Sequence, residues 1–375
     1  MKQLALLAAF VLGCQGFPQD TSRQPRFGKA VRSPEVSRDG HVTFRFSAPN
    51  AKRVSVVLEA APNPVLNKDE KGVWSGSTGV LTPDLYVYSF IVDGVGMGDP
   101  ANPLLKPIAS GGMESIVQVS GDTKQLWEEG DVPHGVLHRQ TYMSKSLGEI
   151  RQFLVYTPPG YAPATRKRYP VLYLLHGVME TCDGWVAAGR AETILDNLIA
   201  TGQAAQMLLV MPTGYGFSEV PDRMADQFNP SKQRPLMDAM GETLLHEIIP
   251  EVERSYKVLK RANARAIAGC SMGGAQALYL GLHHPDVFGS IGSFSGAFIM
   301  YTGELASWLT KPQERWRQTL VVACGKDDFL LFSNRKAAAW LKTKGISPTV
   351  WETPGGHTWN VWRRDLIDYA PLLFK

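Results

Sequence analysis

One serine in this chain has the sequence context of a catalytic nucleophile. Ser271 is the centre of the string Gly-Cys-Ser-Met-Gly at 269–273, which follows an apolar run at 265–268 and precedes a helical pattern at 275–283. A Gly-x-Ser-x-Gly string alone is weak in a chain with 36 glycines. A strand, a sharp turn and a helix in that order, however, form the elbow that presents a nucleophilic serine at a helix N-terminus. We therefore predict that Ser271 is a nucleophile.

A serine hydroxyl needs a base, and in elbow enzymes the base follows the serine in the chain. Three histidines follow Ser271. His283 and His284 end the helix that begins at the serine, so its length carries them away from the nucleophile. His357 lies in the Gly-Gly-His-Thr-Trp string at 355–359, directly after a strand-like run. A loop after the last strand is where the base belongs, so we predict His357.

An acid should orient the base and should lie between Ser271 and His357. Asp327 and Asp328 both follow the apolar run at 320–323, and the residues alone do not choose between them. Glu352 is a distant third because it lies inside the strand-like run before the histidine.

Two backbone N–H groups must stabilise the oxyanion of an acyl-transfer reaction. One is expected from Met272, directly after the nucleophile, and the other from the loop at 176–179 that follows the apolar run at 172–175. His176 is in that loop. Because it precedes Ser271 in the chain, we expect it to make a structural hydrogen bond rather than to act as the base.

The elements around these residues alternate between buried strands and helices from about residue 136 onward. This alternation predicts a mostly parallel sheet covered by helices on both faces. A long stretch at 213–235, rich in Gly, Pro, Asp and Arg, is predicted to be a loop on the substrate side. The expected strands are 153–156, 171–175, 207–211, 265–268, 290–295, 320–324 and 349–353, and the expected helices are 191–201, 238–256 (bent or interrupted near Pro250) and 275–283.

The chain before residue 121 has a different pattern. Residues 34–120 show short period-two runs separated by turns, as at 42–46, 54–58 and 86–92, without a helical period. We predict a small antiparallel β-sandwich at 27–120. A polar, acidic linker is expected at 121–135 and the α/β domain at 136–375.

The first 16 residues have the pattern of an export signal. An apolar run at 4–13 is too short for a permanent membrane span and is followed by small and polar residues. Two processing sites fit. The string Val-Leu-Gly-Cys at 11–14 resembles a bacterial lipobox, which would leave Cys14 lipidated at the cell surface, whereas cleavage after Gly16 would release the protein. Both predict a secreted or periplasmic protein.

The composition narrows the function further. Hydrophobic residues make up 44% of the chain and charged residues 20%, and the net charge is +4. Charges of both signs are interspersed without a basic run, which argues against nucleic-acid binding. Beyond Cys14 the chain has three cysteines, an odd number that cannot all form internal disulfides: Cys182, Cys270 and Cys324. We expect them to be small buried residues. No Cys/His spacing indicates zinc, and the chemistry requires no metal or organic cofactor.

Three stretches together resemble the esterase-D-like α/β-hydrolases, and more closely the bacterial feruloyl and acetyl-xylan esterases of carbohydrate esterase family 1. They are 169–177, 264–274 and 355–363, and the similarity runs from about residue 136 to the end. The resemblance implies Asp328 as the acid, by its place in a Gly-x-x-Asp pattern. It places the second oxyanion donor near Val178, although many members carry glycines where this chain has Val178-Met179-Glu180.

The resemblance also implies substrate contacts and an N-terminal module. Residues near the cleft would be Trp185, Gln276, Phe298 and Trp359, all of which could equally serve in packing. The stretches 33–36, 48–51, 72–74 and 99–103 are similar to the immunoglobulin-like domain related to glycogen-binding and isoamylase-type modules. Trp74, Tyr86 and Tyr88 could form a stacking platform for sugar, although strand aromatics are more often core residues.

We therefore expect a secreted serine esterase that releases ferulate or a related hydroxycinnamate from plant polysaccharide. Within enzymes, the alternatives are an acetyl-xylan esterase and an esterase for siderophores or other small esters. An alternative of another class is a polysaccharide-binding protein whose esterase domain is inactive, against which the intact Ser271, Asp328 and His357 argue.

Overall fold

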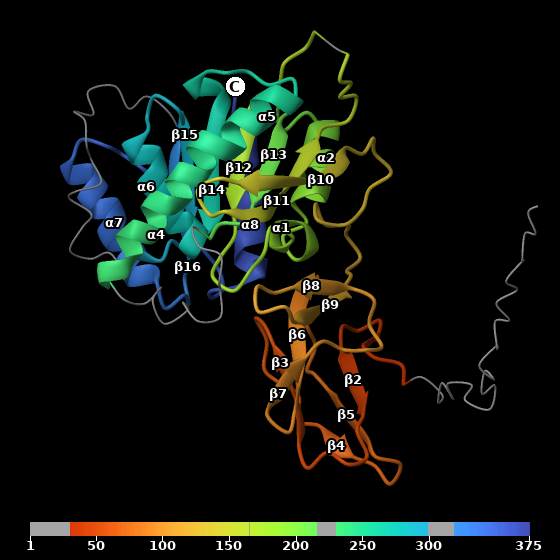
Figure 1. Ribbon diagram of the computed structural model, residues 1–375. Coiled ribbons are helices and arrows are strands. Elements are labelled where there is room, and N and C mark those ends of the chain that lie inside the picture. Colours follow the sequence, from red (N-terminus) through yellow and green to blue (C-terminus); the bar gives the residue numbers. More distant parts are fainter. Residues whose placement is uncertain (1–30, 165, 216–229, 299–318) are drawn as a thin grey trace, which may run out of the picture.

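The computed structural model describes residues 31–164, 166–215, 230–298 and 319–375 of the chain. The predicted export signal at 1–16, with Cys14, lies outside the described residues. Within them the chain forms an N-terminal all-β region and a larger α/β region, joined by an irregular segment (Figure 1). None of the helices in the described part is long and apolar enough to span a bilayer.

The N-terminal region consists of two antiparallel sheets that enclose one apolar core. One sheet has the order β1-β2-β5-β4, and the other has the order β3-β6-β9-β8 with β7 paired to β6. Alternate residues of β2 and β3 are buried, as the period-two pattern predicts. The strands are β1 Glu35–Val36, β2 Val42–Ser47, β3 Val54–Leu58, β4 Asn67–Lys68, β5 Val73–Ser77, β6 Asp84–Val92, β7 Val95–Met97, β8 Leu105–Pro107 and β9 Met113–Val119.

The aromatic residues that could have formed a sugar platform belong largely to this core. Tyr86 and Tyr88 are 4% and 1% exposed and lie in the same apolar cluster as Phe44 and Phe90. Trp74 is half-buried, and its indole N–H donates to the Ala48 carbonyl. The packing explanation for the two tyrosines is therefore confirmed.

The α/β region is built on one eight-stranded sheet with the order β10-β11-β13-β12-β14-β15-β16-β17. β10 and β11 are antiparallel to their neighbours and the remaining strands are parallel. The sheet is thus mostly parallel, as predicted, with an antiparallel edge. The strands are β10 Val136–Ser144, β11 Glu149–Thr157, β12 Val171–Leu175, β13 Leu208–Pro212, β14 Arg265–Cys270, β15 Ser290–Phe294, β16 Leu320–Gly325 and β17 Thr349–Thr353.

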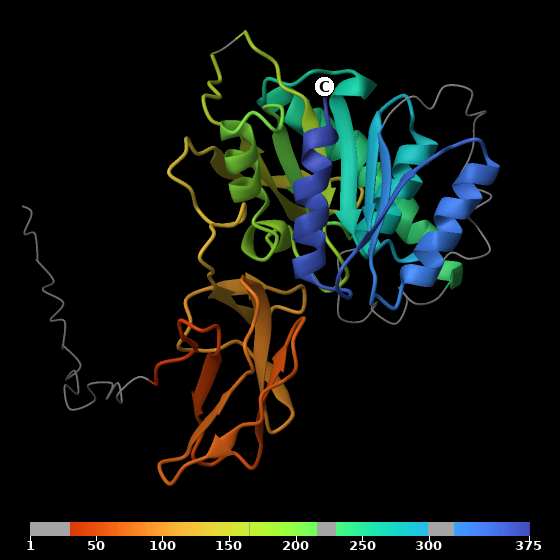
Figure 2. The same ribbon diagram turned by 180° about the vertical axis from the view of Figure 1, so that it is seen from behind.

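Helices cover both faces of this sheet, because its central strands are buried throughout and therefore apolar on both sides. One apolar cluster joins the sheet to α4, α5, α6 and α7, and a second joins it to α1, α2 and α8. Figure 2 shows α8 lying across the second face. The helices are α1 Gly184–Ala187, α2 Ala191–Ala200, α4 Pro230–Thr243, α5 Ile249–Ser255, α6 Met272–His283, α7 Leu331–Thr343 and α8 Trp359–Tyr369.

Two expectations change in the segment between β13 and β14. The helix predicted at 238–256 begins earlier, at Pro230, and the interruption predicted near Pro250 is a π-helical turn at Leu244–Ile248 that separates α4 from α5. Pro250 lies in the first turn of α5, where its missing N–H is tolerated. The predicted loop at 213–235 is therefore too long, because residues 230–235 are helical. Its central part, 216–229, lies outside the described residues.

The two regions share a continuous interface. Leu85, Val87 and Ile116 of the β-region belong to the apolar cluster beneath α8. Arg363 of α8 is fully buried and donates to the Asp84 carboxylate at 2.5 Å and to the Leu85 carbonyl at 2.8 Å. The β-region is thus fixed to the α/β region by both apolar and charged contacts.

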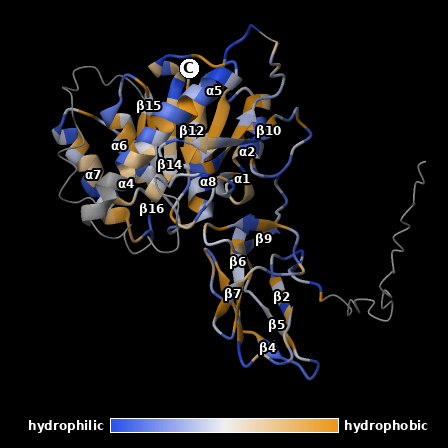
Figure 3. Cartoon of the chain, viewed as in Figure 1, coloured by the Kyte–Doolittle hydropathy of each residue, from blue (hydrophilic) through white to orange (hydrophobic). Residues whose placement is uncertain are grey.

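Figure 3 shows that orange, apolar segments fill the centre of the eight-stranded sheet.

Candidate active site

The backbone at Ser271 makes a strained turn between β14 and α6. Its φ of 52° and ψ of −116° are far from the values that non-glycine residues favour. Glycine is required nearby, because a Cβ on Gly273 would lie 2.6 Å from the carbonyl oxygens of Leu175 and His176. A Cβ on Gly269 would lie 2.6 Å from the Gly273 backbone. The predicted strand, sharp turn and helix around Ser271 are therefore present.

The structure brings the three predicted catalytic side chains into one hydrogen-bonded chain. His357, in the loop between β17 and α8, places Nε2 2.9 Å from Ser271 Oγ and Nδ1 2.8 Å from Asp328 Oδ2. Because the Asp328 carboxylate can only accept, Nδ1 carries the proton and Nε2 is free to accept from the serine hydroxyl. Ser271 and Asp328 are buried, while the His357 side chain is 19% exposed. This arrangement can move a proton from the serine to the imidazole.

Electrostatics keep Asp328 ionised. Burial opposes ionisation, but hydrogen bonds from His357 and from the Leu330 N–H, together with the positive charge that His357 carries when protonated, outweigh it. The net effect lowers the pKa of Asp328 below its ordinary value. Asp327 is exposed, and its backbone N–H donates to Gly355. The aspartate that touches His357 is therefore Asp328.

The other candidates for the base and the acid lie elsewhere. Glu352 pairs with Arg335 through two hydrogen bonds of 2.7 and 2.8 Å on the protein surface. His283 ends α6, as predicted. His176 is buried, with Nε2 accepting the Gly214 N–H at 2.8 Å, and burial lowers its pKa to about 4. The structural hydrogen bond predicted for His176 is therefore present.

The predicted oxyanion donors lie next to each other. Met272 is the first residue of α6, so its N–H is one of those that a helix leaves without an internal partner. Val178 belongs to a small apolar cluster with Met272 and with Ala109 of the β-region. The next residue, Met179, has a φ of 66°, in the left-handed region that favours glycine. A methionine at this position is therefore held in a conformation that glycine would adopt without strain.

The four residues predicted to contact substrate are all buried. Trp185, Phe298 and Trp359 are 1–2% exposed and Gln276 is 4% exposed. The Trp185 indole donates to the Leu175 carbonyl, and the Gln276 amide donates to the Gly214 carbonyl. Trp359 packs edge-on against Trp185, with ring centroids 5.2 Å apart. Phe298 belongs to the apolar cluster that joins the sheet to α6. The four residues thus have packing roles, and their contact with substrate stays a prediction.

Two aromatic rings flank His357 that the sequence analysis did not single out. Trp362 packs edge-on against the imidazole with centroids 5.0 Å apart, and Phe329 lies 4.8 Å from it on another side. The Phe329 side chain is largely exposed, at 73%. The only signal in the sequence was the position of Phe329, directly after the predicted acid Asp328.

A cavity of about 310 Å³ opens beside His357 between the two regions of the chain. The residues that the β-region contributes to this cavity are marked by no motif in the sequence and were not predicted. The α/β region contributes Glu180, His357, Trp359 and Trp362, and the β-region contributes Val57, Glu59, Val87, Lys106 and Glu114.

The remaining nucleophilic and metal-binding side chains do not form a second centre in the described residues. Cys182, Cys270 and Cys324 are all buried thiols without a disulfide, in agreement with their prediction as small buried residues. Burial raises the pKa of Cys182 to about 11, so it is a poor nucleophile at neutral pH. In the same residues no group of three or more His, Cys, Asp or Glu could hold a metal ion.

Known proteins resemble this chain in both sequence and fold. A curated endo-1,4-beta-xylanase/feruloyl esterase from Xylanibacter ruminicola is 30% identical over 358 residues, which cover 91% of this chain. This chain spans only 46% of that relative's length. Among solved structures, a ferulic acid esterase from Anaeromyces mucronatus in complex with ferulic acid is 25% identical, with a TM-score of 0.58 over 69% of this chain and 98% of its own.

A second solved structure covers both regions of the chain. The enterobactin esterase from Shigella flexneri has a TM-score of 0.66 over 89% of this chain and 95% of its own, at 20% identity. That likeness supports the fold, an α/β-hydrolase preceded by antiparallel sheets. Residues 144–373 also match the family model described as "Putative esterase". With more than half of its residues matched, the chain belongs to this esterase family.

Proposed function

We propose that the protein hydrolyses carboxylic esters with Ser271 as nucleophile, His357 as general base and acid, and Asp328 as the orienting carboxylate. The observation that carries this proposal is the unbroken hydrogen-bonded chain from Ser271 Oγ through His357 to Asp328, on a strained elbow. The neutral Nε2 accepts the serine proton while Oγ attacks the ester carbonyl carbon.

The oxyanion that forms would accept hydrogen bonds from the Met272 N–H and from the loop at Val178. His357 then gives its proton to the leaving alkoxide, and a covalent acyl-enzyme intermediate remains on Ser271. In the second half, His357 takes a proton from water, the resulting hydroxide attacks the acyl carbon, and Ser271 leaves with that proton. No metal or organic cofactor takes part in this scheme.

The test is substitution of Ser271 by alanine. The expected kcat on 4-nitrophenyl acetate falls by about 10⁴-fold or more, because the nucleophile is lost. The matched control is Ser290→Ala, a buried serine at the opposite end of the adjacent strand β15, which should keep wild-type kcat. Near-wild-type turnover in Ser271→Ala would refute the proposal.

We propose hydroxycinnamoyl esters of plant polysaccharide, such as feruloyl arabinoxylan, as the substrates. Support comes from the xylanase/feruloyl esterase relative, from the ferulic acid complex of the similar structure, and from the exposed Phe329 ring beside His357. A second candidate is a cyclic catecholate ester, favoured by the enterobactin esterase likeness over 89% of the chain. Acetylated xylan is the third substrate to compare.

Side-by-side kcat/KM values separate these substrates. Methyl ferulate, acetylated xylan and enterobactin would each be incubated with the wild type and with Ser271→Ala as the blank. The proposal expects the highest value for methyl ferulate. A value for enterobactin that is 10-fold higher would replace it with the catecholate function.

We also propose that the protein is exported, on the sequence of residues 1–16 alone. Expression of the full chain in a bacterial host followed by mass measurement distinguishes the two processing routes. Cleavage after Gly16 releases an unmodified mature chain. Lipidation instead adds the mass of acyl chains at Cys14, and this added mass should be absent in Cys14→Ala. An uncleaved, cytoplasmic product would contradict export.

A further inference from the structure

A buried ammonium group stands at the interface between the β-region and the α/β region. Lys106 of β8 is 2% exposed, and its Nζ lies 2.6 and 2.7 Å from the two Glu180 carboxylate oxygens and 2.7 Å from Glu114. Burial alone would lower the pKa of Lys106, but the two carboxylates outweigh it and raise the pKa. Lys106 is therefore a charged residue that the β-region inserts against the α/β region.

Glu180, the partner of Lys106, directly follows the predicted oxyanion loop at 176–179. The chain turns back at 177–180, where the Glu180 N–H points to the Gly177 carbonyl at 3.4 Å. Ile108 forms an antiparallel bridge with Glu180, and the Ala109 N–H donates to the Met179 carbonyl at 2.8 Å. A left-handed methionine costs about 1 kcal/mol or more. Contacts from outside the loop, made by residues 106–109, therefore stabilise it in this conformation.

The same group of charges also reaches the loop that carries His357. The Trp359 indole N–H donates to Glu180 at 3.2 Å, and the Trp359 backbone N–H donates to Glu59 of the β-region at 2.7 Å. Lys106 Nζ lies 6.0 Å from the centre of the Trp359 ring. Trp359 is two residues after His357 and begins α8. Glu180 thus connects Lys106 to both loops that flank Ser271.

We propose that Lys106 is a positioning residue for the esterase reaction, fixing the oxyanion loop through Glu180 and the His357 loop through Glu180 and Trp359. The β-region then forms part of the catalytic centre, although it supplies no group that reacts. This inference rests on the proposed function. An error of about 1 Å in the position of a reacting group can slow an enzyme by about 100-fold, so the loss of a distant contact is measurable in kcat.

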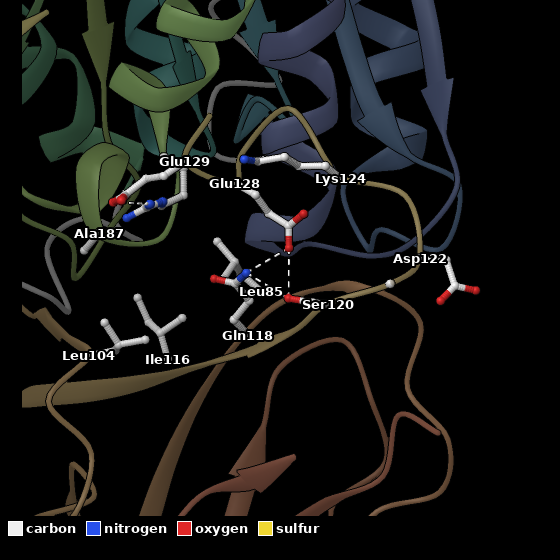
Figure 4. Close-up of a pocket in the computed structure, with 12 residues that line it drawn as sticks. Leu85, Leu104, Ile116, Gln118, Ser120, Asp122, Lys124, Glu128, Glu129 and Ala187 are labelled. Carbon is white, nitrogen blue, oxygen red and sulfur yellow. Dashed lines mark hydrogen bonds and ion pairs between the residues drawn. The ribbon is translucent and has the colours of Figure 1, made fainter. Parts of the chain in front are cut away.

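The experiment compares Lys106→Met with Lys106→Arg and Glu180→Gln in the full chain. Lys106→Met keeps most of the side-chain volume but leaves the Glu180 and Glu114 carboxylates, whose side chains are 12% and 32% exposed, without their cation. Glu180→Gln keeps the shape and removes one charge, so it is the variant to rely on if Lys106→Met folds poorly. The matched control is Glu128→Gln, which also removes the charge of a hydrogen-bonded carboxylate. Glu128 belongs to the linker and lines a separate cavity of about 590 Å³ between the two regions (Figure 4). None of the residues lining that cavity belongs to the loops at 176–180 or 355–359.

Two rates are measured for each variant: kcat and KM on methyl ferulate, and the rate at which a fluorophosphonate labels Ser271. Labelling also counts the active sites, so each kcat is expressed per competent site. For Lys106→Met we expect kcat per site and the labelling rate to fall by about 10-fold to 100-fold, with KM changed less than about 3-fold. Lys106→Arg should restore both rates to within about 3-fold, and Glu128→Gln should match the wild type.

The outcomes separate a positioning role from a structural role. A variant with a lower melting temperature and fewer labelled sites, but wild-type kcat per site and wild-type labelling rate, would overturn the proposal. If the wild type hydrolyses no ester of the panel, the proposed function fails instead. The labelling rates of the wild type and Lys106→Met would still test whether Lys106 positions the loops.

Discussion

The contact between Asp328 and His357 makes a quantitative prediction about catalysis. In the resting state a neutral imidazole donates Nδ1–H to the Asp328 carboxylate at 2.8 Å. When His357 takes the serine proton, that contact becomes an ion pair, so the carboxylate stabilises the transition state more than the ground state. Replacing Asp328 by asparagine keeps the size of the side chain and removes the charge. It therefore tests the charge of this contact together with the carboxylate's role in fixing the Nδ1–H tautomer.

The size of the effect follows from the distance. Two unit charges 2.8 Å apart attract by about 6 kcal/mol at an effective dielectric constant of about 20, which suits a partly buried pair. Each 1.36 kcal/mol of lost transition-state stabilisation reduces the rate tenfold, so kcat should fall by about 10⁴-fold. KM for a small ester should change little, because Asp328 is buried behind His357.

The neighbouring aspartate provides a control of the same type. Asp327→Asn changes an exposed carboxylate one residue away and should leave kcat within about 2-fold, as for surface substitutions. Both variants would be assayed on 4-nitrophenyl acetate between pH 5 and 9, with active sites counted by fluorophosphonate labelling. A loss of less than 10-fold in Asp328→Asn, or equal losses in both variants, would refute the assignment of the acid.

Three further changes probe the site and its support. Burial raises the pKa of Asp365 to about 7. Between about pH 4 and pH 7 the folded protein therefore keeps a proton on Asp365 that the unfolded chain has lost, so the free energy of unfolding falls as the pH rises through this range. Urea unfolding should show a loss of about 3 kcal/mol between pH 5 and 8 in the wild type that is absent in Asp365→Asn, and parallel pH dependences would contradict this. Phe329→Ala should raise KM for methyl ferulate about 5-fold, because about 1 kcal/mol of aromatic contact is lost, and should leave the rate on acetylated xylan unchanged. Equal effects on both substrates would count against an aromatic contact. Asp84→Asn leaves the Arg363 guanidinium buried without its anion and should cost about 3–5 kcal/mol of stability, read as a lower thermal midpoint, while an unchanged midpoint would exclude a stabilising role for the pair.

Local sequence rules were sufficient for the elements that carry the reacting groups. The elbow at Ser271 depends on glycines that pack against neighbouring backbone, and this requirement is written in the string itself. The loop position of His357 follows from chain order and from the strand before it. Choosing Asp328 over Asp327 required the family resemblance, because both residues follow the same strand and only the folded loop decides which one turns inward.

Contacts between distant parts of the chain could not be predicted in the same way. Lys106 and Glu180 are 74 residues apart, and Trp359 and Glu59 are 300 residues apart. Lys106 and Glu59 have an ordinary local context that no periodicity or motif marks, and the motif that contains Trp359 does not indicate its partners. An interruption near Pro250 was predicted, but its form as a π-helical turn was not.

The interface also bears on what the β-region contributes to the protein. A module that only captured polysaccharide would need an exposed aromatic surface and a flexible attachment. Here Tyr86 and Tyr88 are core residues, and the fully buried Arg363 ties α8 to the β-region four residues after Trp359. The buried Lys106 also contacts Glu180 next to the predicted oxyanion loop. This contact requires the two regions to keep one fixed arrangement, which a freely tethered module would not have. We therefore expect deletion of residues 31–120 to abolish hydrolysis of methyl ferulate, a substrate without any sugar, and unchanged turnover of that ester by the shortened chain would show that the β-region is an independent module.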